Sequence, residues 1–266
     1  MATRPILPAA VSPRPGAWRK FCGSLLKIME IRLPGRRIYL LRRKGRRRIM
    51  SILAIVVVEL FTSQGCSSCP PADALLALLD QDPNVIVLSE HVDYWNHLGW
   101  RDPYSLNAFS MRQHRYAQAF NQDGPYTPQM VVDGRTQFVG SDERQARTAI
   151  ARAGRTAKLP VKLAREGDRV RVSVPALPAD GKAKSAELWV ALVRPEGASQ
   201  VPRGENAGRT LRHVAIVRSL TKAGTATRKD GVEHLIDLPP AEGNAWRVAA
   251  FLQEPGQGAI LGGGRL

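Results

Sequence analysis

Two of the three cysteines in this 266-residue chain, Cys66 and Cys69, are separated by two residues in the stretch VVVELFTSQGCSSCPPADALL. An apolar, β-branched run precedes them and a leucine-rich segment follows, so the pair is expected where a strand passes into a helix. Unpaired N–H groups and the helix dipole stabilise a thiolate there and lower its pKa from about 8.5. The sequence therefore predicts a redox-active pair in which Cys66 attacks and Cys69 resolves the mixed disulfide.

Other residues are expected to serve this pair. Thr127-Pro128 directly precedes a predicted hairpin strand, where a cis proline would lie beside the cysteines and its neighbour would bind a substrate backbone. Glu59, near the end of the first strand, is a candidate carrier for the proton of the resolving thiol, or else an ordinary Glu in water. Tyr94 and Trp95 are candidates to line a groove for a peptide substrate, or to pack an insertion against the sheet.

The same cysteines also admit other interpretations. His91 follows a second predicted strand and would emerge at the same edge of the sheet, so Cys66, Cys69 and His91 together would suit copper or zinc. His91 could equally orient a loop, and the cysteines could be inert thiols or a structural disulfide. A metal-binding or metal-delivery module is therefore an alternative to redox chemistry.

Two other polar stretches have a simpler interpretation. Arg112, His114 and Arg115 lie on a predicted helix and are expected to form a solvated face. The stretch GENAGRTLRH has the polar, glycine-rich composition of a functional loop, but nothing in it identifies a ligand.

The elements that must position these residues alternate between strand and helix from residue 52 onward. The predicted order is strand, helix, strand, helix, hairpin, helix, with Asp133-Gly134 as the hairpin turn. A cysteine pair between a buried strand and a helix, in this order of elements, indicates a thioredoxin-like fold. After residue 160 the pattern becomes period-2 segments separated by Gly, Pro and Asp, which predicts a β-sandwich or barrel.

The net charge of +16 is concentrated near the N-terminus. Residues 1–49 hold 14 of the 39 Lys and Arg residues and one of the 23 acidic residues. This distribution favours a leader or tail over a nucleic-acid-binding surface, and Met50 is a candidate start. The apolar run IMSILAIVVV is too short for a bilayer, which needs about 20 residues, and no small-residue cleavage site follows it. No transmembrane segment and no nucleic-acid partner are expected.

Five stretches, VVVELFTSQGCSSCPPADALL, HVDYWNHLGWRDP, YTPQMVVDG, GENAGRTLRH and AFLQEPGQGAILGGGRL, resemble the family called domain of unknown function 1223. The resemblance covers roughly residues 55–266 and implies a thioredoxin-like N-terminal part in an exported, periplasmic or secreted protein. Glu90 and Asn96-His97 depart from the family pattern. The absence of a clear cleavable export signal is a further departure and leaves a cytoplasmic location open.

The expected fold class is an α/β thioredoxin-like domain followed by an all-β sandwich-like domain. The expected divisions are a basic leader over residues 1–50 that is disordered or lies outside the mature fold, a thioredoxin-like domain over 51–155 and a β-sandwich over 156–266. The predicted function is a thiol-disulfide oxidoreductase that acts on protein or peptide thiols and disulfides and needs no organic cofactor. The alternatives are the copper or zinc module and a non-catalytic thioredoxin-fold binding protein, and the sequence does not indicate the oligomeric state.

Overall fold

The computed structural model describes residues 26–33, 36–43, 54–240 and 246–266. The chain separates into two compact units, Met1–Ile52 and Leu53–Leu266. In the first unit, strand β1 (Leu26–Leu33) pairs antiparallel with strand β2 (Arg36–Arg43). Cys22 and Met50 lie outside the described residues. All the predicted site residues belong to the second unit.

The first half of the second unit has the predicted succession of strand, helix, strand, helix, hairpin and helix. Its elements are β3 (Val56–Thr62), α1 (Pro70–Leu79), β4 (Val85–His91), the 3-10 helix η1 (Asn96–Leu98), α2 (Asn107–Ala119), β5 (Gln129–Val132), β6 (Thr136–Val139) and α3 (Glu143–Ala153). Asp133 and Gly134 have φ values of 52° and 63°, and such positive values are what an Asp-Gly hairpin turn requires.

The second half consists of strands only. They are β7 (Lys162–Glu166), β8 (Arg169–Val174), β9 (Ser185–Gln200), β10 (Thr210–Thr227), β11 (Val232–Asp237), β12 (Arg247–Gln253) and β13 (Ile260–Arg265). With 16 and 18 residues, β9 and β10 are much longer than the predicted period-2 segments. They pair antiparallel along their whole length.

The expected fold class, a thioredoxin-like α/β domain followed by a separate sandwich-like domain, is wrong. The protein is mostly β, and strands from both halves form one mixed sheet of eight strands in the order β13-β12-β9-β10-β4-β3-β5-β6. The halves meet where β10 pairs in parallel with β4, at Ile216 and Ser89. Hydrophobic periodicity identifies a strand but does not say which sheet edge it joins, so the sequence pattern alone suggested two sheets.

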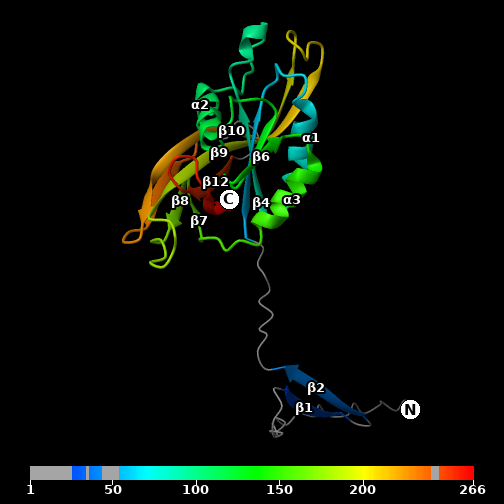
Figure 1. Ribbon diagram of the computed structural model, residues 1–266, viewed down its shortest axis with the longest axis vertical. Coiled ribbons are helices and arrows are strands. Elements are labelled where there is room, and N and C mark those ends of the chain that lie inside the picture. The colour runs from blue at the N-terminus through cyan, green and yellow to red at the C-terminus, as the bar shows by residue number, and fades with distance from the viewer. Residues whose placement is uncertain (1–25, 34–35, 44–53, 241–245) are drawn as a thin grey trace, which may run out of the picture. The chain divides into compact units, whose positions relative to one another are not determined.

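Helices cover the central strands of this sheet on both faces, with α1 and α3 on one face and α2 on the other (Figure 1). Every residue of β3 and β4 is buried, as expected for strands covered on both faces. Side chains alternate along β3, so Leu60 packs on the α1 face while Phe61 contacts Tyr116 of α2. The end of β3 can therefore send neighbouring side chains into two different environments.

A second hydrophobic cluster lies where the three-stranded sheet β11-β8-β7 packs against strands of the large sheet. Val170, Val172 and Val174 of β8 share it with Leu188 of β9 and Val248 of β12. The period-2 pattern that suggested a sandwich therefore reflects one small sheet that covers part of a larger one.

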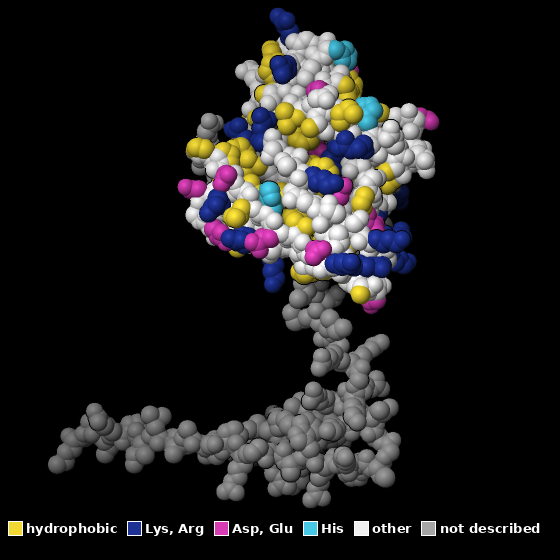
Figure 2. Space-filling model, turned by 90° about the vertical axis from the view of Figure 1, so that its left-hand side faces the viewer, with side chains coloured by type: hydrophobic (Ala, Val, Ile, Leu, Met, Phe, Trp, Pro, Cys, Tyr) yellow, Lys and Arg dark blue, Asp and Glu magenta, His cyan; other side chains and the backbone are white. Residues whose placement is uncertain are grey.

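The surface of the second unit carries charges of both signs. Figure 2 shows Lys and Arg side chains interspersed with Asp and Glu on the face drawn. None of the helices in the described ranges has both the length and the apolar character needed to cross a bilayer.

A charged side chain, Arg112 of α2, is the largest of the fully buried ones. Its Nε donates to Glu59 Oε1 at 2.6 Å, and its Nη2 donates to Gln253 Oε1 at 2.9 Å. The guanidinium also lies 5.1 Å from the Trp189 ring centre and 5.4 Å from that of Phe251. The expectation that Arg112 belongs to a solvated face is wrong because the far end of the large sheet closes over α2. Its helix neighbours His114 and Arg115 are exposed, as predicted.

Glu90 of β4 is a second acid in this core. It is fully buried, its two carboxylate oxygens have no hydrogen-bond partner that meets geometric criteria, and Oε2 lies 3.8 Å from Arg112 Nε. Burial, and then the negative charge of Glu59, raise the pKa of Glu90 well above its ordinary value. Glu90 is therefore expected to keep its proton to a higher pH in the folded protein than in the unfolded chain.

We expect Arg112→Met to destabilise the protein by about 3–5 kcal/mol, since it leaves the buried Glu59 carboxylate without its cation. The matched control is Arg115→Met, three residues further along the same helix and exposed, which should change the free energy of unfolding by no more than about 0.5 kcal/mol. Urea denaturation of both variants measures the difference. If the two variants lower the free energy of unfolding equally, the buried ion pair of Arg112 contributes no more to stability than an exposed arginine does.

The raised pKa of Glu90 predicts a pH dependence of stability. Above the ordinary pKa of 4.5 the unfolded chain loses this proton while the folded protein keeps it, so the free energy of unfolding falls as the pH rises. Glu90→Gln cannot ionise and should gain stability relative to the wild type from pH 5 to pH 8, by at most about 1.4 kcal/mol per pH unit. Urea denaturation at each pH tests this, and parallel curves for the two proteins would contradict it.

Candidate functional site

Cys66 and Cys69 lie in the turn between β3 and α1, as predicted. Their Cα atoms are 5.5 Å apart and their sulfur atoms are within bonding distance, so the structure contains the pair as a disulfide. Cys69 is the N-cap of α1, and Pro70 begins the helix. Both cysteine side chains are buried, but Ser67 and Ser68 between them are exposed. The disulfide therefore lies directly beneath the protein surface.

The loop that joins β9 to β10 holds this turn from the other half of the chain. Asn206 is fully buried, and its Nδ2 donates to the backbone oxygens of Gln64 at 3.0 Å and Cys66 at 2.8 Å. Asn206 belongs to GENAGRTLRH, the stretch whose composition suggested a functional loop without indicating a ligand. It contacts the cysteine turn only because the two halves of the chain share one sheet.

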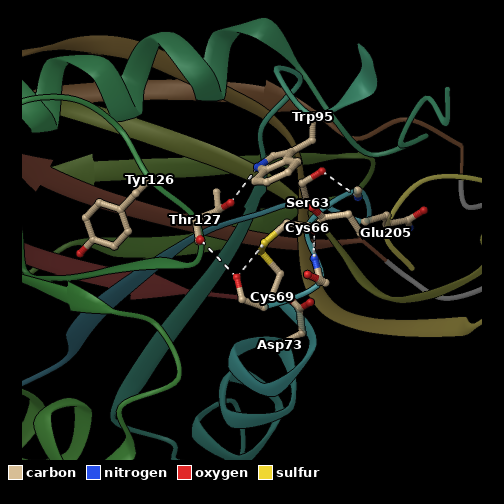
Figure 3. Close-up of a disulfide and its surroundings, with 12 residues drawn as sticks. Ser63, Cys66, Cys69, Asp73, Trp95, Tyr126, Thr127 and Glu205 are labelled. Atoms are coloured by element: carbon tan, nitrogen blue, oxygen red, sulfur yellow. Dashed lines mark hydrogen bonds between the residues drawn. A yellow bond between two sulfur atoms is a disulfide. The ribbon is translucent and has the colours of Figure 1, made fainter. Parts of the chain in front are cut away.

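The two serines between the cysteines make different contacts. The N–H of Ser67 donates to Glu205 Oε2 at 2.8 Å, and this hydrogen bond lowers the pKa of Glu205. Ser68 Oγ lies 3.3 Å from Cys66 Sγ and donates to the backbone oxygen of Thr127 at 3.5 Å. Ser68 thus connects the first cysteine to the loop that precedes β5. Thr127 of that loop lies beside Cys66 in Figure 3.

The Thr127-Pro128 segment lies against the cysteine turn, and its predicted cis peptide bond is present. Trp95 connects the two, because its Nε1 donates to Thr127 Oγ1 at 2.8 Å and its Cβ would lie 2.9 Å from a Cβ added to Gly65. Only glycine allows this close approach of the tryptophan to the turn. Thr127 and Trp95 are half-buried and form one wall beside the disulfide (Figure 3).

Tyr94 contacts α2 rather than the cysteines. Its hydroxyl donates to Gln113 Oε1 at 3.1 Å, and burial raises the pKa of Tyr94 to about 12. Glu59 also faces α2: one carboxylate oxygen accepts from Arg112 and the other from the Tyr116 hydroxyl. Tyr94 and Glu59 therefore both contact α2, which lies on the opposite face of the sheet from α1.

A group of buried polar side chains lies on the α1 face of the sheet. His91 Nδ1 is 2.7 Å from Asp102 Oδ2, and the His91 ring packs edge-to-face on His213 of β10 at 4.6 Å between centroids. His213 Nδ1 is in turn 3.6 Å from Asp73 Oδ2. Burial alone would raise the pKa of Asp102, but the charge and hydrogen bond of His91, together with two backbone N–H groups, lower it overall. The sequence drew attention to His91 but not to Asp73, Asp102 or His213.

The proposed metal set of Cys66, Cys69 and His91 does not form in this arrangement. Within residues 54–240 and 246–266, no three His, Cys, Asp or Glu side chains come together in a way that could hold a metal ion. His91 instead has its Nδ1 on Asp102, and the two sulfur atoms are bonded to each other.

Proteins of known structure include chains that are similar in fold to this one. A protein of Agrobacterium tumefaciens whose crystal structure is known is similar over 80% of this chain and 94% of its own, with 32% identity and a TM-score of 0.65. HBP35 of Porphyromonas gingivalis is similar in fold over 80% of this chain and 74% of its own, with a TM-score of 0.53 and 16% identity. No protein among the curated ones matches the sequence.

The family comparison covers the cysteine turn, the buried histidines and the loop that holds Asn206. Residues 57–253 match the family described as "Protein of unknown function (DUF1223)". This range is most of the second unit, and it confirms the resemblance seen in the sequence. The chain is therefore a member of the DUF1223 family.

Proposed function

We propose that this protein is a thiol-disulfide oxidoreductase in which Cys66 and Cys69 alternate between dithiol and disulfide. The observation that carries the proposal is the position of the pair at the start of α1, bonded as a disulfide and separated from solvent only by Ser67 and Ser68. A disulfide in this position closes a loop of two residues and does little to constrain the unfolded chain, because that contribution grows with loop length. Its stabilising effect alone is thus a weak reason for the pair.

The proposed reaction exchanges one disulfide for another. In the direction that reduces the substrate, the Cys66 thiolate attacks one substrate sulfur, a Cys66–substrate bond forms, and the other substrate sulfur leaves as a thiolate. Cys69 then attacks Cys66 Sγ, the protein disulfide closes, and the second substrate thiol is released. Two electrons pass from the protein dithiol to the substrate disulfide, and the reverse sequence oxidises a substrate dithiol. No organic cofactor takes part.

Ser68 is the side chain best placed to stabilise the Cys66 thiolate. Pro70 and Pro71 have no N–H, so the first turn of α1 offers fewer backbone donors than a helix without prolines. The Ser68 hydroxyl, 3.3 Å from Cys66 Sγ, can donate to the thiolate instead.

The wall beside the disulfide is the proposed contact for a peptide substrate. Thr127 would offer backbone groups to an extended segment that Pro128 helps to position, and the half-buried ring of Trp95 would pack against the side chains of that segment. Tyr94 would border the same surface through its neighbour Trp95, whose ring centre lies 6.4 Å from its own. The substrates are accordingly protein or peptide thiols and disulfides.

The first prediction concerns the redox equilibrium of the pair. In graded glutathione buffers, Cys66 and Cys69 should be oxidised together in one reversible two-electron transition, measured by alkylation and peptide mass spectrometry so that Cys22 is counted separately. A midpoint near about −120 to −180 mV would indicate an oxidase or isomerase, and one near about −270 mV a reductant. Cys66→Ser should abolish the transition. If the wild type shows no reversible transition, the oxidoreductase proposal fails.

The second prediction concerns the Cys66 thiolate. In reduced protein, Ser68→Ala should move the midpoint of the pH profile for Cys66 alkylation upward by about 0.5 to 1 pH unit. The reason is that the thiolate loses a hydrogen-bond donor that water only partly replaces. Ser67→Ala is the matched control and should leave the midpoint where it is, since the Ser67 contact with Glu205 uses the backbone N–H. Identical midpoints in both variants would show that the Ser68 hydroxyl does not act on the thiolate.

A further inference from the structure

The closing step of such an exchange needs a base, because the buried thiol of Cys69 must lose its proton before it attacks Cys66. We propose that Asp73 accepts this proton and that His213 positions the Asp73 carboxylate. This inference rests on the proposed redox function. It names the group that accepts the proton of Cys69, which the residues predicted from the sequence do not supply. Glu59, the acid predicted for that role, has both oxygens bound by Arg112 and Tyr116 on the α2 face.

Helix geometry places Asp73 next to Cys69. Cys69 is the N-cap of α1, and Asp73 follows four residues later in the first turn. Side chains four residues apart lie on the same face of a helix, one above the other. The backbone N–H of Asp73 donates to the oxygen of Cys69 at 3.1 Å, so this turn is closed. Figure 3 shows Asp73 rising from the first turn of α1 toward the cysteines.

The Asp73 carboxylate is buried without the partners that a structural acid would have. Its side chain is 6% exposed, Oδ1 has no hydrogen-bond partner, and Oδ2 lies 3.6 Å from His213 Nδ1. A buried polar atom without a partner costs stability, so its position calls for an explanation other than stability. A carboxylate that must take up and release a proton needs one free oxygen.

His213 is well placed to hold Asp73. It is 3% exposed, comes from β10, and packs against the rings of His91 and Tyr104, whose centroids lie 4.6 Å and 6.0 Å away. Its Nε2 is 3.4 Å from Gln64 Nε2. These contacts fix the ring, so its Nδ1 faces Asp73 rather than the cysteines. His213 is therefore a positioning residue and Asp73 the proton acceptor.

A groove of about 720 Å³ connects both residues to solvent. It runs between α1 and the β9–β10 hairpin, and Pro70, Asp73 and His213 are part of its lining. Several charged and titratable groups surround Asp73 and His213. They are His91 at the end of β4, Asp102, Tyr104, and the groove residues Arg194, Glu196, Arg209 and Arg212. Water in this groove can remove the proton after the step.

The closing step moves one proton and exchanges one disulfide bond for another. The Cys69 S–H bond breaks and its proton passes to Asp73 Oδ1, while the sulfur keeps the electron pair. The Cys69 thiolate forms a bond to Cys66 Sγ, the bond between Cys66 and the substrate sulfur breaks, and the substrate leaves as a thiolate. That thiolate takes a proton from water, and Asp73 returns its own proton to water through the groove.

The test separates the two steps of one reaction. Reduced full-length protein is mixed with oxidised glutathione and quenched by alkylation at intervals, and mass spectrometry counts the glutathione adduct at Cys66 and the closed disulfide. Asp73→Asn should slow the closing step at pH 7 by about 100-fold to 10,000-fold, the usual contribution of a general base. The difference in closing rate between the wild type and Asp73→Asn should become smaller above about pH 9, where a thiol ionises without a base. Formation of the Cys66 adduct should keep the wild-type rate.

Two further variants complete the design. Asp80→Asn makes the same change at the other end of α1, where Asp80 pairs with Arg247, and should leave both steps unchanged. His213→Gln should slow the closing step by about 2-fold to 5-fold with the same pH dependence, because it loosens Asp73 without removing it. If Asp73→Asn does not fold, as judged by circular dichroism, the pH profile of His213→Gln decides.

The outcomes distinguish this inference from the proposed function. If the wild type forms no adduct at Cys66, the redox function fails and the role of Asp73 with it. If the wild type completes both steps and Asp73→Asn closes at the wild-type rate at every pH, only the role of Asp73 is overturned. It is also overturned if Asp73→Asn slows both steps equally at every pH, since a purely structural residue would do that.

Discussion

The pairing of β10 with β4 is the contact on which the cysteine site depends. It is short, a parallel bridge at Ile216 and Ser89, yet it joins an antiparallel group of long strands to the strands that alternate with helices. Because β9 and β10 extend well beyond this bridge, the loop between them reaches the turn between β3 and α1. Asn206 then supplies hydrogen bonds to two backbone oxygens of that turn. Without this pairing the turn would have to satisfy those oxygens with water.

The two faces of the large sheet bury polar groups in opposite ways. On the α2 face, Arg112 is surrounded by Glu59, Tyr116 and Gln253, and each of these accepts or donates a hydrogen bond. On the α1 face, Asp73 and His213 are equally buried but keep atoms without partners. A satisfied network rigidifies a core, whereas an unsatisfied group costs stability and is expected where chemistry requires it. Glu90, on the α2 face, also has oxygens without hydrogen-bond partners, but it is fully buried, whereas Asp73 lines a groove that is open to solvent. A free oxygen together with access to that groove, rather than burial alone, separates the acid with a proposed chemical role from the acids with a structural one.

The sequence was a good guide to local structure. The cysteine turn, the proline-started helix, the Asp133-Gly134 hairpin and the order of elements up to residue 153 all depend on residues close together in the chain. Family membership followed from motifs of the same kind. Arg112 shows the limit of such reasoning. An arginine on a helix is exposed in most proteins, as its neighbour Arg115 is here. Arg112 is covered in part by Trp189, Phe251 and Gln253, from strands more than 75 residues away in the chain.

The sequence by itself determined where a cysteine pair would lie and which elements would flank it, because helix starts, turns and buried strands are set by short-range patterns. Tertiary structure decided that the two halves form one sheet, and it placed Asn206 against the cysteine turn and His213 beside Asp73. The physical reason is that strand pairing between distant segments depends on the fit of whole edges and faces, and no local window of sequence contains that information. The surroundings of the cysteines were therefore fixed by contacts across more than 130 residues of chain.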